Sequence, residues 1–467
     1  MPLNEPTSEF LLKLARITYC DTPTARYLEE PRGRYVGQGA VVVRPRSVRE
    51  VSEIMRLCNT HKIGVVPFGG GTGLVGGQTL VTGPKPVILS LERMNSIRDV
   101  DPADNILTTE SGVILADIQN AANDVRRLFP LSLASEGSCQ IGGNLATNAG
   151  GVNVLRYGNT RDLCLGIEAV LPDGSIFGGL KRLRKDNTGY NLRNLLIGAE
   201  GTLGIITAAT LRLMPKPVDV ETAFLAIPNP QASVEILNRL STKLGEVVSA
   251  FELIHRQGLD FLNETGIAFT KPLSSNTEWM VLLECGTGGN SGLKDNLEGI
   301  LADAFDAGLI TDAVLAQNEA QRHAFWNIRE SIPEANRRVG VISSHDISVP
   351  VSQVPEFIVR AATMIETINP QFRINCFGHL GDGNLHYNIY PPKGENRAQY
   401  DDIRASLAND VYELVDSFGG SFSAEHGVGR MKKADLLKYS DPAKLSAMRA
   451  IKHALDPNGI MNPGAVI

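Results

Sequence analysis

A glycine-rich loop directly after an apolar strand is the feature that most restricts the fold of this chain. The sequence reads IGVVPFGGGTGLVGG, and Gly71, Gly73 and Gly76 in it have the spacing G-x-G-x-x-G. Glu92 follows about twenty residues later, as an acidic residue does in the dinucleotide-binding fingerprint. That fingerprint also requires a helix at its third glycine, because the N-terminus of the helix binds the pyrophosphate.

The residues after the loop do not permit such a helix. They read QTLVTGPKP, and Gly83, Pro84 and Pro86 interrupt any helical pattern. Successive backbone amides must therefore hold an anion here without a helix dipole. A glycine-rich turn with no ligand is the alternative for a single loop. Two further polar segments, EGSCQIGGNLATNAGG at 136–151 and IGAEGTLGIIT at 197–207, favour a ligand, because buried polar groups need hydrogen-bond partners.

Charge and cysteine content exclude several classes of function. The 467 residues carry 45 Lys and Arg against 51 Asp and Glu, and a net charge of -6 does not attract nucleic acid. No C-x-x-C occurs, so neither a thiolate zinc site nor a disulfide framework is expected, and a reducing compartment fits best. The six cysteines are scattered: Cys20, Cys58, Cys139, Cys164, Cys285 and Cys376.

Targeting signals are not evident in the sequence. The first residues lack a basic-then-apolar order, and no stretch approaches the ~18 apolar residues of a membrane span. We therefore expect a cytoplasmic protein without a nucleic acid partner, with peripheral membrane contact left open.

The order of apolar segments predicts a mixed α and β first region. Ser47 and Glu50 form a capping box for a helix over 47–62, between two short strands. Two prolines in MPKPVD, residues 214–219, indicate a domain junction. Beyond it, VETAFLAI, WMVLLECG and the helical segments between such strands predict an antiparallel sheet backed by helices.

Two of the eight histidines flank one Asp-Gly in HLGDGNLHYN. We take Asp382 and Gly383 as the centre of a two-residue type I′ turn. Counting outward then places His379 directly opposite His386, with Cβ atoms about 4.5 to 5.5 Å apart on one face. Both imidazoles then reach one metal ion, and Asn388 faces the same side.

A third ligand is available in SAEHGVG, where Glu425 precedes His426 in a loop bounded by glycine. Two histidines and a carboxylate form a catalytic zinc set with an open position for substrate, and iron or manganese could also occupy it. One alternative is a polar hairpin whose histidines only form hydrogen bonds. A zinc hydrolase is another, disfavoured because H-E-x-x-H is absent and because hydrolysis leaves three glycine-rich loops without a ligand.

Several blocks of the sequence resemble one family. They include PFGGGTGLVGG, EGSCQIGGNLATNAGG, LRKDNTGYNLRNLLIGAEGTLGIIT, FGHLGDGNLHYN, SAEHGVG and DPNGIMNPG. From about residue 38 onward the chain resembles the FAD-linked oxidases with a vanillyl-alcohol-oxidase (PCMH-type) flavin domain. Within these it is most similar to the D-2-hydroxyglutarate dehydrogenases and the related D-lactate and glycolate enzymes.

The resemblance implies an α+β fold with three parts. A two-part PCMH-type FAD-binding domain is expected over 1–216, and a ferredoxin-like antiparallel-sheet substrate (cap) domain with the metal-binding hairpin over 217–424. A C-terminal helical segment over 425–467 is expected to return to the flavin and complete the active site.

The family implies a set of residues for FAD. Around the pyrophosphate these are Gly69, Gly70, Gly71, Thr72, Gly73 and Leu74. Others implied are Glu136, Ser138, Gly142, Gly143, Asn144, Thr147, Asn148, Gly151, Ile206 and the C-terminal Asn462. Some relatives attach FAD covalently through a histidine in the first glycine loop; this loop has none, so we expect non-covalent FAD.

The resemblance also implies an active site. His379, His386 and Glu425 are expected to bind zinc or another divalent metal, with His426 as the base. Arg329 in WNIRES is expected to bind the substrate carboxylate, and Asn388 to add a polar contact. The alternative for Arg329 is an exposed helix arginine paired with a nearby glutamate.

The implied reaction oxidises a D-2-hydroxy acid to the 2-oxo acid by metal-assisted hydride transfer to flavin. D-2-Hydroxyglutarate is the first expectation. A D-lactate dehydrogenase or glycolate oxidase type of enzyme is the alternative, and a non-catalytic flavin-binding subunit is a distant one. The electron acceptor, an electron-transfer flavoprotein or a quinone, stays open, as does a homodimer.

Two positions depart from the D-2-hydroxyglutarate enzymes. Those enzymes have a threonine four residues after the arginine and a lysine in the next strand, where this chain has Pro333 and Ser344. Recognition of a distal carboxylate then needs another positive group, unless the substrate is a smaller acid such as D-lactate. The candidates are Arg182, Arg184, Arg193 and a protonated His345.

Overall fold

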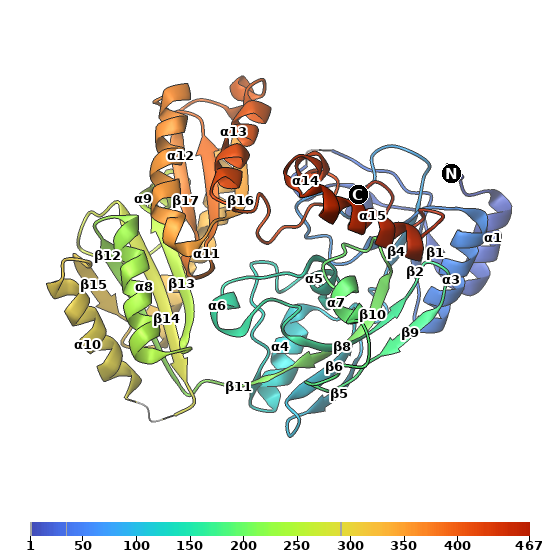
Figure 1. The fold of residues 1–467 in the computed structure, drawn as a ribbon, viewed down its shortest axis with the longest axis horizontal. Helices are drawn as coiled ribbons and strands as arrows, with labels where there is room; N and C mark the ends of the chain where they lie inside the picture. Colours follow the sequence, from blue (N-terminus) through green and yellow to red (C-terminus); the bar gives the residue numbers. More distant parts are fainter. Residues whose placement is uncertain (1, 34, 290–291) are drawn as a thin grey trace. The chain divides into compact units, whose positions relative to one another are not determined.

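The computed structural model describes residues 2–33, 35–289 and 292–467 (Figure 1). The chain forms two units. The first consists of Met1–Gly151, Gly158–Lys216 and Glu425–Ile467, and the second of Val152–Tyr157 and Pro217–Ala424. Both ends of the chain therefore belong to the first unit.

A four-stranded sheet in the first unit contains the strands before and after the glycine-rich loop. Its order is β1 (Tyr19–Asp21), β2 (Val41–Arg44), β4 (Val87–Ser90) and β3 (Val65–Phe68), with β2, β4 and β3 parallel. Helix α3 (Val48–His61) joins β2 to β3, as such parallel pairs require. Its apolar face is buried, with Val51, Ile54, Met55 and Cys58 in the core of this unit.

The predicted capping box of α3 forms only in half. Ser47 Oγ accepts a hydrogen bond from the Glu50 amide at 3.2 Å, as expected. The Glu50 carboxylate instead accepts bonds from the Thr18 hydroxyl at 2.8 Å and the Arg46 amide at 3.0 Å. The difference arises because the N-terminal segment brings a competing donor to this helix end.

A five-stranded antiparallel sheet forms the other part of the first unit. Its order is β5 (Ile97–Asp101), β6 (Ile106–Glu110), β10 (Ile205–Arg212), β8 (Cys164–Val170) and β9 (Ile176–Gly179). A Pro-Asp-Gly turn joins β8 to β9, and Gly174 at its end has φ +84°, which favours glycine.

The remaining elements of the first unit are short helices and one strand pair. The helices are α1 (Ser8–Ile17), α2 (Ala25–Leu28), α4 (Leu115–Asp124), α5 (Ile141–Thr147), α7 (Leu192–Leu196), α14 (Lys433–Tyr439) and α15 (Pro442–Leu455). The pair consists of β7 (Arg127–Leu128) and β11 (Met214–Pro215).

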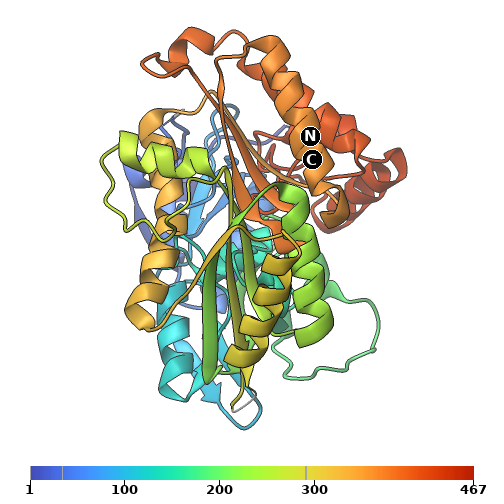
Figure 2. The same cartoon turned by 90° about the vertical axis from the view of Figure 1, so that its left-hand side faces the viewer.

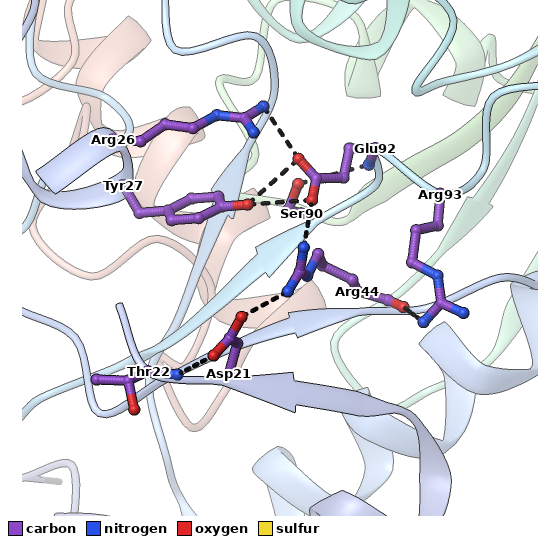
Figure 3. A network of polar contacts seen from close by, with 8 residues as sticks. All are labelled: Asp21, Thr22, Arg26, Tyr27, Arg44, Ser90, Glu92 and Arg93. Carbon is purple, nitrogen blue, oxygen red and sulfur yellow. Dashed lines mark hydrogen bonds and ion pairs between the residues drawn. The ribbon is translucent and has the colours of Figure 1, made fainter. Parts of the chain in front are cut away.

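Glu92 has a structural role in the first unit, shown in Figure 3. Its carboxylate accepts a hydrogen bond from the Tyr27 hydroxyl and forms ion pairs with Arg26 at 3.0 Å and Arg44 at 3.1 Å. Arg44 also pairs with Asp21. The acidic residue at the dinucleotide-fingerprint distance thus fastens the N-terminal segment to the sheet.

A seven-stranded antiparallel sheet is the centre of the second unit. Its order is β15 (Asp312–Leu315), β12 (Asp219–Ile227), β14 (Trp279–Thr287), β13 (Val248–His255), β17 (Arg373–His379), β18 (Asn384–Tyr390) and β16 (Ser343–Ser348). Figure 2 shows helices on both faces of this sheet. The predicted α+β fold, with an antiparallel second sheet backed by helices, is confirmed.

Two helices cover the sheet face that carries Phe377 and Tyr390. They are α9 (Arg256–Glu264) and α11 (Glu319–Val339), whose apolar residues share a core with Phe377 of β17 and Tyr390 of β18. The other elements of this unit are α6 (Val154–Tyr157), α8 (Pro230–Leu244), α10 (Leu293–Asp306), α12 (Val354–Ile368) and α13 (Arg404–Ser417), with 3-10 turns at Val351–Gln353, Leu380–Asp382 and Arg397–Tyr400. None of the helices in the described ranges combines the length and apolar character needed to cross a membrane.

Candidate active site

A cavity in the first unit is enclosed by its glycine-rich segments. Its lining includes residues 69–73, most residues of 139–147 and of 200–206, and Ser111, His426 and Asn462. Its empty space, including the opening to solvent, is about 1060 Å³.

Glycine is required in this cavity because backbone segments approach each other closely. A Cβ at Gly70 would clash with the carbonyl oxygen of Ser138, and one at Gly142 would lie 2.6 Å from Ser111 Cβ. A Cβ at Gly143 would meet nothing within 4 Å, so space remains above that backbone. The glycines thus bring two loops together and keep a surface clear for a ligand.

Three buried polar atoms in the cavity wall have no hydrogen-bond partner among the described residues. They are Ser111 Oγ, Gln140 Oε1 and Asn144 Oδ1. Buried polar groups normally form hydrogen bonds, so a ligand that offers donors and acceptors fits this wall. Residues 69–86 form no helix that could take part, in agreement with the expectation from Gly83, Pro84 and Pro86.

The C-terminal segment is fastened to the glycine-rich loop. Arg430 donates hydrogen bonds of 2.8 Å to the carbonyl oxygens of Gly76 and Gly77, and another of 2.7 Å to Asn462 Oδ1. Burial lowers the pKa of Arg430 to about 10, with opposition from the nearby Tyr35 and Glu200.

Glu200 holds the loop that carries His426. Its carboxylate accepts hydrogen bonds of 2.7 Å from the amides of Val428 and Gly429. Burial raises the pKa of Glu200, although these two amides act in the opposite direction. Its backbone has φ +50°, so a non-glycine residue is held in the left-handed region where the two segments meet.

The histidine pair lies in the second unit with a register different from the predicted one. Phe377, not His379, is the strand partner of His386, and His379 pairs with Glu252 of β13. A 3-10 turn at Leu380–Asp382 replaces the two-residue type I′ turn. The predicted turn is wrong because the Asp382 side chain accepts the amide of residue 384 at 3.1 Å, and only Gly383 takes positive φ.

The two imidazoles nevertheless lie on one face. The register differs by two residues, and an even shift leaves side chains on the same side of a sheet. The rings of His379 and His386 are 5.6 Å apart between centroids. They are therefore diagonal neighbours instead of directly opposed partners.

A fully buried glutamate organises this face of the sheet. Glu252 receives the His379 ring through Nδ1 on one carboxylate oxygen and Arg329 Nε at 2.6 Å on the other. Burial alone would raise the pKa of Glu252, but the charges of His379 and Arg329 outweigh it and lower the pKa to about 2. In its neutral form, His379 would donate Nδ1–H to the Glu252 carboxylate, and this hydrogen bond would direct the Nε2 lone pair toward a metal.

Arg329 is buried, contrary to the alternative of an exposed helix arginine. It is 6% exposed, and its guanidinium stacks on the Phe377 ring with 4.7 Å to the centroid. Nε is used by Glu252, whereas Nη1 and Nη2 donate no hydrogen bond to any residue in the described stretches. Two charged donors thus remain for a carboxylate.

Strand β16 places its residues on opposite faces. Asp346 is the register partner of His386, and its carboxylate lies 3.9 Å from His386 Nδ1. His345 points to the other face, where it contacts Ser343 and the Tyr412 ring. A protonated His345 therefore cannot replace the missing lysine, because adjacent strand residues face opposite sides.

Family models match both halves of the chain. The model described as "FAD linked oxidases, C-terminal domain" matches residues 216–466, and the one described as "FAD binding domain" matches residues 39–178. The chain belongs to the FAD-linked oxidase family.

Named relatives of this family member extend over most of its length. It is 36% identical to the mitochondrial D-2-hydroxyglutarate dehydrogenase of Arabidopsis thaliana, over 93% of this chain and 76% of that protein. A putative mitochondrial D-lactate dehydrogenase of Schizosaccharomyces pombe is 35% identical, over 92% of this chain and 82% of its own. The solved structure of p-cresol methylhydroxylase with substrate bound shares the fold, with a TM-score of 0.78 at 18% identity over 100% of this chain and 98% of that one.

The cavity of this FAD-linked oxidase contains most residues that the resemblance suggested for FAD. Those lining it are Gly69, Gly70, Gly71, Thr72, Gly73, Gly142, Gly143, Asn144, Thr147, Ile206 and Asn462. Those outside its lining are Leu74, Glu136, Ser138, Asn148 and Gly151. His426, suggested as the base, also lines this cavity.

Four polar residues of these two sites were not predicted from the sequence. Gln140 and Glu200 lie inside glycine-rich segments that the sequence did indicate, but the two residues themselves were not singled out. Ser111 lies outside every such block and carried no signal. Glu252 interrupts the apolar strand segment VVSAFELI, and an acidic residue there was the available signal, since buried glutamates are nearly always paired.

The suggested metal ligands are divided between the two units. His379 and His386 belong to the second unit, whereas Glu425 and the neighbouring His426 belong to the first. In the first unit Glu425 Oε1 accepts the Gly151 amide at 2.6 Å. Within the second unit, His379 and His386 therefore form a pair of candidate metal ligands.

Proposed function

We propose that this protein is an FAD-dependent dehydrogenase that oxidises a D-2-hydroxy acid to the 2-oxo acid. The names of its relatives, D-2-hydroxyglutarate and D-lactate dehydrogenase, support this substrate class. One observation carries the proposal: the buried Glu252 joins His379 to Arg329. A metal-facing imidazole and a carboxylate-binding guanidinium on one carboxylate fit a substrate whose hydroxyl is next to a carboxylate.

The residues of the first unit suit FAD. The glycine loop offers backbone amides for the pyrophosphate, and the unpaired polar atoms of Ser111, Gln140 and Asn144 offer partners for polar groups of the cofactor. The His379–His386 pair suits a divalent ion, because Glu252 orients one ring from behind. Bound FAD would supply the two-electron acceptor for the C2 hydrogen, and a divalent ion would make the 2-hydroxyl more acidic.

Glu425 is the proposed third ligand of that ion, because it directly follows a residue that is hydrogen-bonded to the strand beside His386. The amide of Ala424 bonds to the Asp346 carbonyl oxygen at 3.3 Å, and Asp346 is the register partner of His386. Glu425 follows Ala424 directly, and consecutive Cα atoms are about 3.8 Å apart. This direct chain connection supports Glu425 as the third ligand.

The protein's own groups have separate tasks in this proposal. Arg329 binds the substrate carboxylate through Nη1 and Nη2, in the bidentate geometry that guanidinium favours. Asn388 is 5% exposed, its Oδ1 has no partner in the described chain, and it accepts a hydrogen bond from the substrate. His426 takes the hydroxyl proton.

Anaerobic flavin reduction tests the proposal. The purified protein should be yellow, contain a divalent metal, and lose its flavin absorbance when one member of a panel of D-2-hydroxy acids is added. His426→Ala should keep the colour and lose the bleaching, whereas the control His323→Ala, at an exposed histidine of α11, should keep both. A colourless protein, or bleaching of His426→Ala at the parent rate, would refute the corresponding part.

A further inference from the structure

A loop at residues 150–159 leaves the first unit, enters the second and returns to the first. Its middle part, Val152–Tyr157, belongs to the second unit, whereas the residues before and after it belong to the first. The base of the loop is closed by the buried Thr160, whose amide and hydroxyl donate hydrogen bonds of 3.0 and 2.7 Å to the carbonyl oxygen of Ala149. Loop 150–159 is therefore a compact segment with its ends held together, a kind of loop that frequently has a function.

The base of loop 150–159 continues the wall of the cavity proposed for FAD. Most residues of helix α5 line this cavity, and the helix ends at Asn148, which has φ +50°. The Asn148 side chain accepts a hydrogen bond of 2.9 Å from the amide of Arg161, which follows the loop. A ligand that fixes α5 therefore also fixes both ends of the loop, because the same hydrogen bonds join them.

The first residues of loop 150–159 contact the proposed third metal ligand. The Gly151 amide donates a hydrogen bond of 2.6 Å to Glu425 Oε1. Gly151 has φ +102°, and a Cβ there would collide with the carbonyl oxygen of Ser132, so this position requires glycine. The resemblance suggested Gly151 for FAD, whereas in the structure its amide is directed to Glu425 and orients that carboxylate.

The tip of loop 150–159 supports the turn between the two histidines. Leu155 of α6 lies against Gly381 of that turn, where an added Cβ would be 2.6 Å from Leu155 Cδ2 and 3.3 Å from its Cγ. Arg156 fastens α6 to the sheet, because its Nη1 donates a hydrogen bond of 2.6 Å to the carbonyl oxygen of Gly286 in β14. The missing side chain at Gly381 thus lets α6 contact the backbone that separates the histidine pair.

We propose that loop 150–159 positions the three proposed metal ligands and makes FAD and the divalent ion bind cooperatively. This inference rests on the proposed dehydrogenase function and adds a coupling between its two cofactors. Gly151 and Leu155 are positioning residues, since one orients Glu425 and the other supports the turn of the histidine pair. Both depend on a loop base that α5 fixes when the cavity is filled. By linkage, FAD and the ion then raise each other's affinity by the same factor.

Release of FAD from the holoenzyme measures this coupling. Flavin fluorescence after dilution gives the dissociation constant of FAD, once with Zn²⁺ present and once with the metal removed by a chelator. We expect Zn²⁺ to tighten FAD binding about tenfold or more. Equal FAD affinities in a protein that binds both cofactors would overturn the inference and leave the dehydrogenase function standing. A protein that binds no FAD, or no Zn²⁺, would refute the cofactor assignment on which both proposals rest.

Leu155→Ala removes the support of the turn and leaves the cavity lining intact. Calorimetry should show Zn²⁺ binding to this holoenzyme weakened about tenfold or more, and the effect of Zn²⁺ on FAD affinity should fall about threefold or more. Metal-free FAD affinity should equal that of the parent. Leu12→Ala in α1, at a side chain that is 67% exposed, is the control and should keep the parent values. A merely structural role would leave the effect of Zn²⁺ on FAD affinity unchanged, and that outcome would contradict the inference.

Gly381→Ala tests the same contact from the turn. Its methyl group would lie 2.6 Å from Leu155 Cδ2, so it should displace the turn and weaken Zn²⁺ binding. The double variant Leu155→Ala with Gly381→Ala removes the clash and should bind Zn²⁺ more tightly than Gly381→Ala alone. Additive losses in the double variant would show that the two positions act separately, against the proposed support of the turn by α6.

Discussion

Removal of the Glu252 charge should destabilise the second unit more than any surface substitution. In Glu252→Gln the side chain keeps its size but retains only one acceptor oxygen for two donors, Arg329 Nε and His379 Nδ1. One donor then faces an amide N–H group. The guanidinium of Arg329 stays charged at 6% exposure and loses its counter-ion.

Two estimates give the size of this effect. Breaking a buried ion pair by removing one partner costs about 3–5 kcal/mol. Independently, the pKa of Glu252 falls from 4.5 to about 2 on folding, against the effect of burial and because of His379 and Arg329. At about 1.4 kcal/mol for each pH unit, that fall contributes about 3 kcal/mol. Because the folded pKa is the lower one, the contribution is complete above about pH 4.5 and is lost as the pH falls toward 2.

Tryptophan fluorescence during urea unfolding measures this loss directly. The chain has two tryptophans, Trp279 in β14 and Trp326 in α11, and both belong to the second unit. A loss of about 3 kcal/mol should lower the urea midpoint by about 1 M or more at pH 7. The experiment is done in metal-free buffer, so that no added metal ion changes the hydrogen bond between His379 and Glu252. The difference from the parent should shrink at pH 3.

A matched control and a clear refutation accompany this measurement. Glu298→Gln in α10 removes an equivalent charge whose side chain is 49% exposed, and its midpoint should stay with the parent. If Glu252→Gln unfolds within about 0.5 kcal/mol of the parent at pH 7, the buried carboxylate does not hold this face together. The same result would remove the main support for a fixed His379 tautomer.

Two further predictions concern the cavity of the first unit. Gly70→Ala should abolish retention of FAD during purification, because its Cβ would collide with the Ser138 carbonyl oxygen, whereas Gly137→Ala, with nothing within 4 Å, should remain yellow. Arg430→Met should weaken FAD binding about tenfold or more, because it removes the hydrogen bond to the Gly76 carbonyl oxygen in the glycine-rich loop. A fluorescence titration of the apoprotein measures this affinity, and an unchanged value would contradict the prediction.

Local sequence patterns predicted those helices and turns that depend on residues close together in the sequence. The α3 helix follows from its Ser47 cap and its apolar face, and the β8–β9 turn follows from Pro-Asp-Gly. The capping partner of Glu50 could not be predicted, because Thr18 reaches it from thirty-two positions away in the sequence. Contacts between distant segments depend on the fold and leave little trace in either segment.

For the site, too, residues in local motifs were predicted, whereas contacts between distant parts of the sequence were not. Glycine-rich blocks and the flanking histidines mark the cavity and the histidine pair, since each requires residue types that the chain concentrates there. Glu252 reaches His379 across 127 positions and Arg329 across 77. One acidic residue within VVSAFELI was the single local sign of that network.

The histidine register shows which part of a sheet argument survives an error in the turn. The predicted turn length was wrong, and His386 pairs with Phe377 in place of His379. The error was an even number of residues, so the face was right and only the spacing along the strand was wrong. The same alternation places Ser344 and Asp346 on the face opposite to that of His345. The face that a side chain occupies can therefore be predicted even where the turn is wrong, whereas distances along the strands depend on the turn.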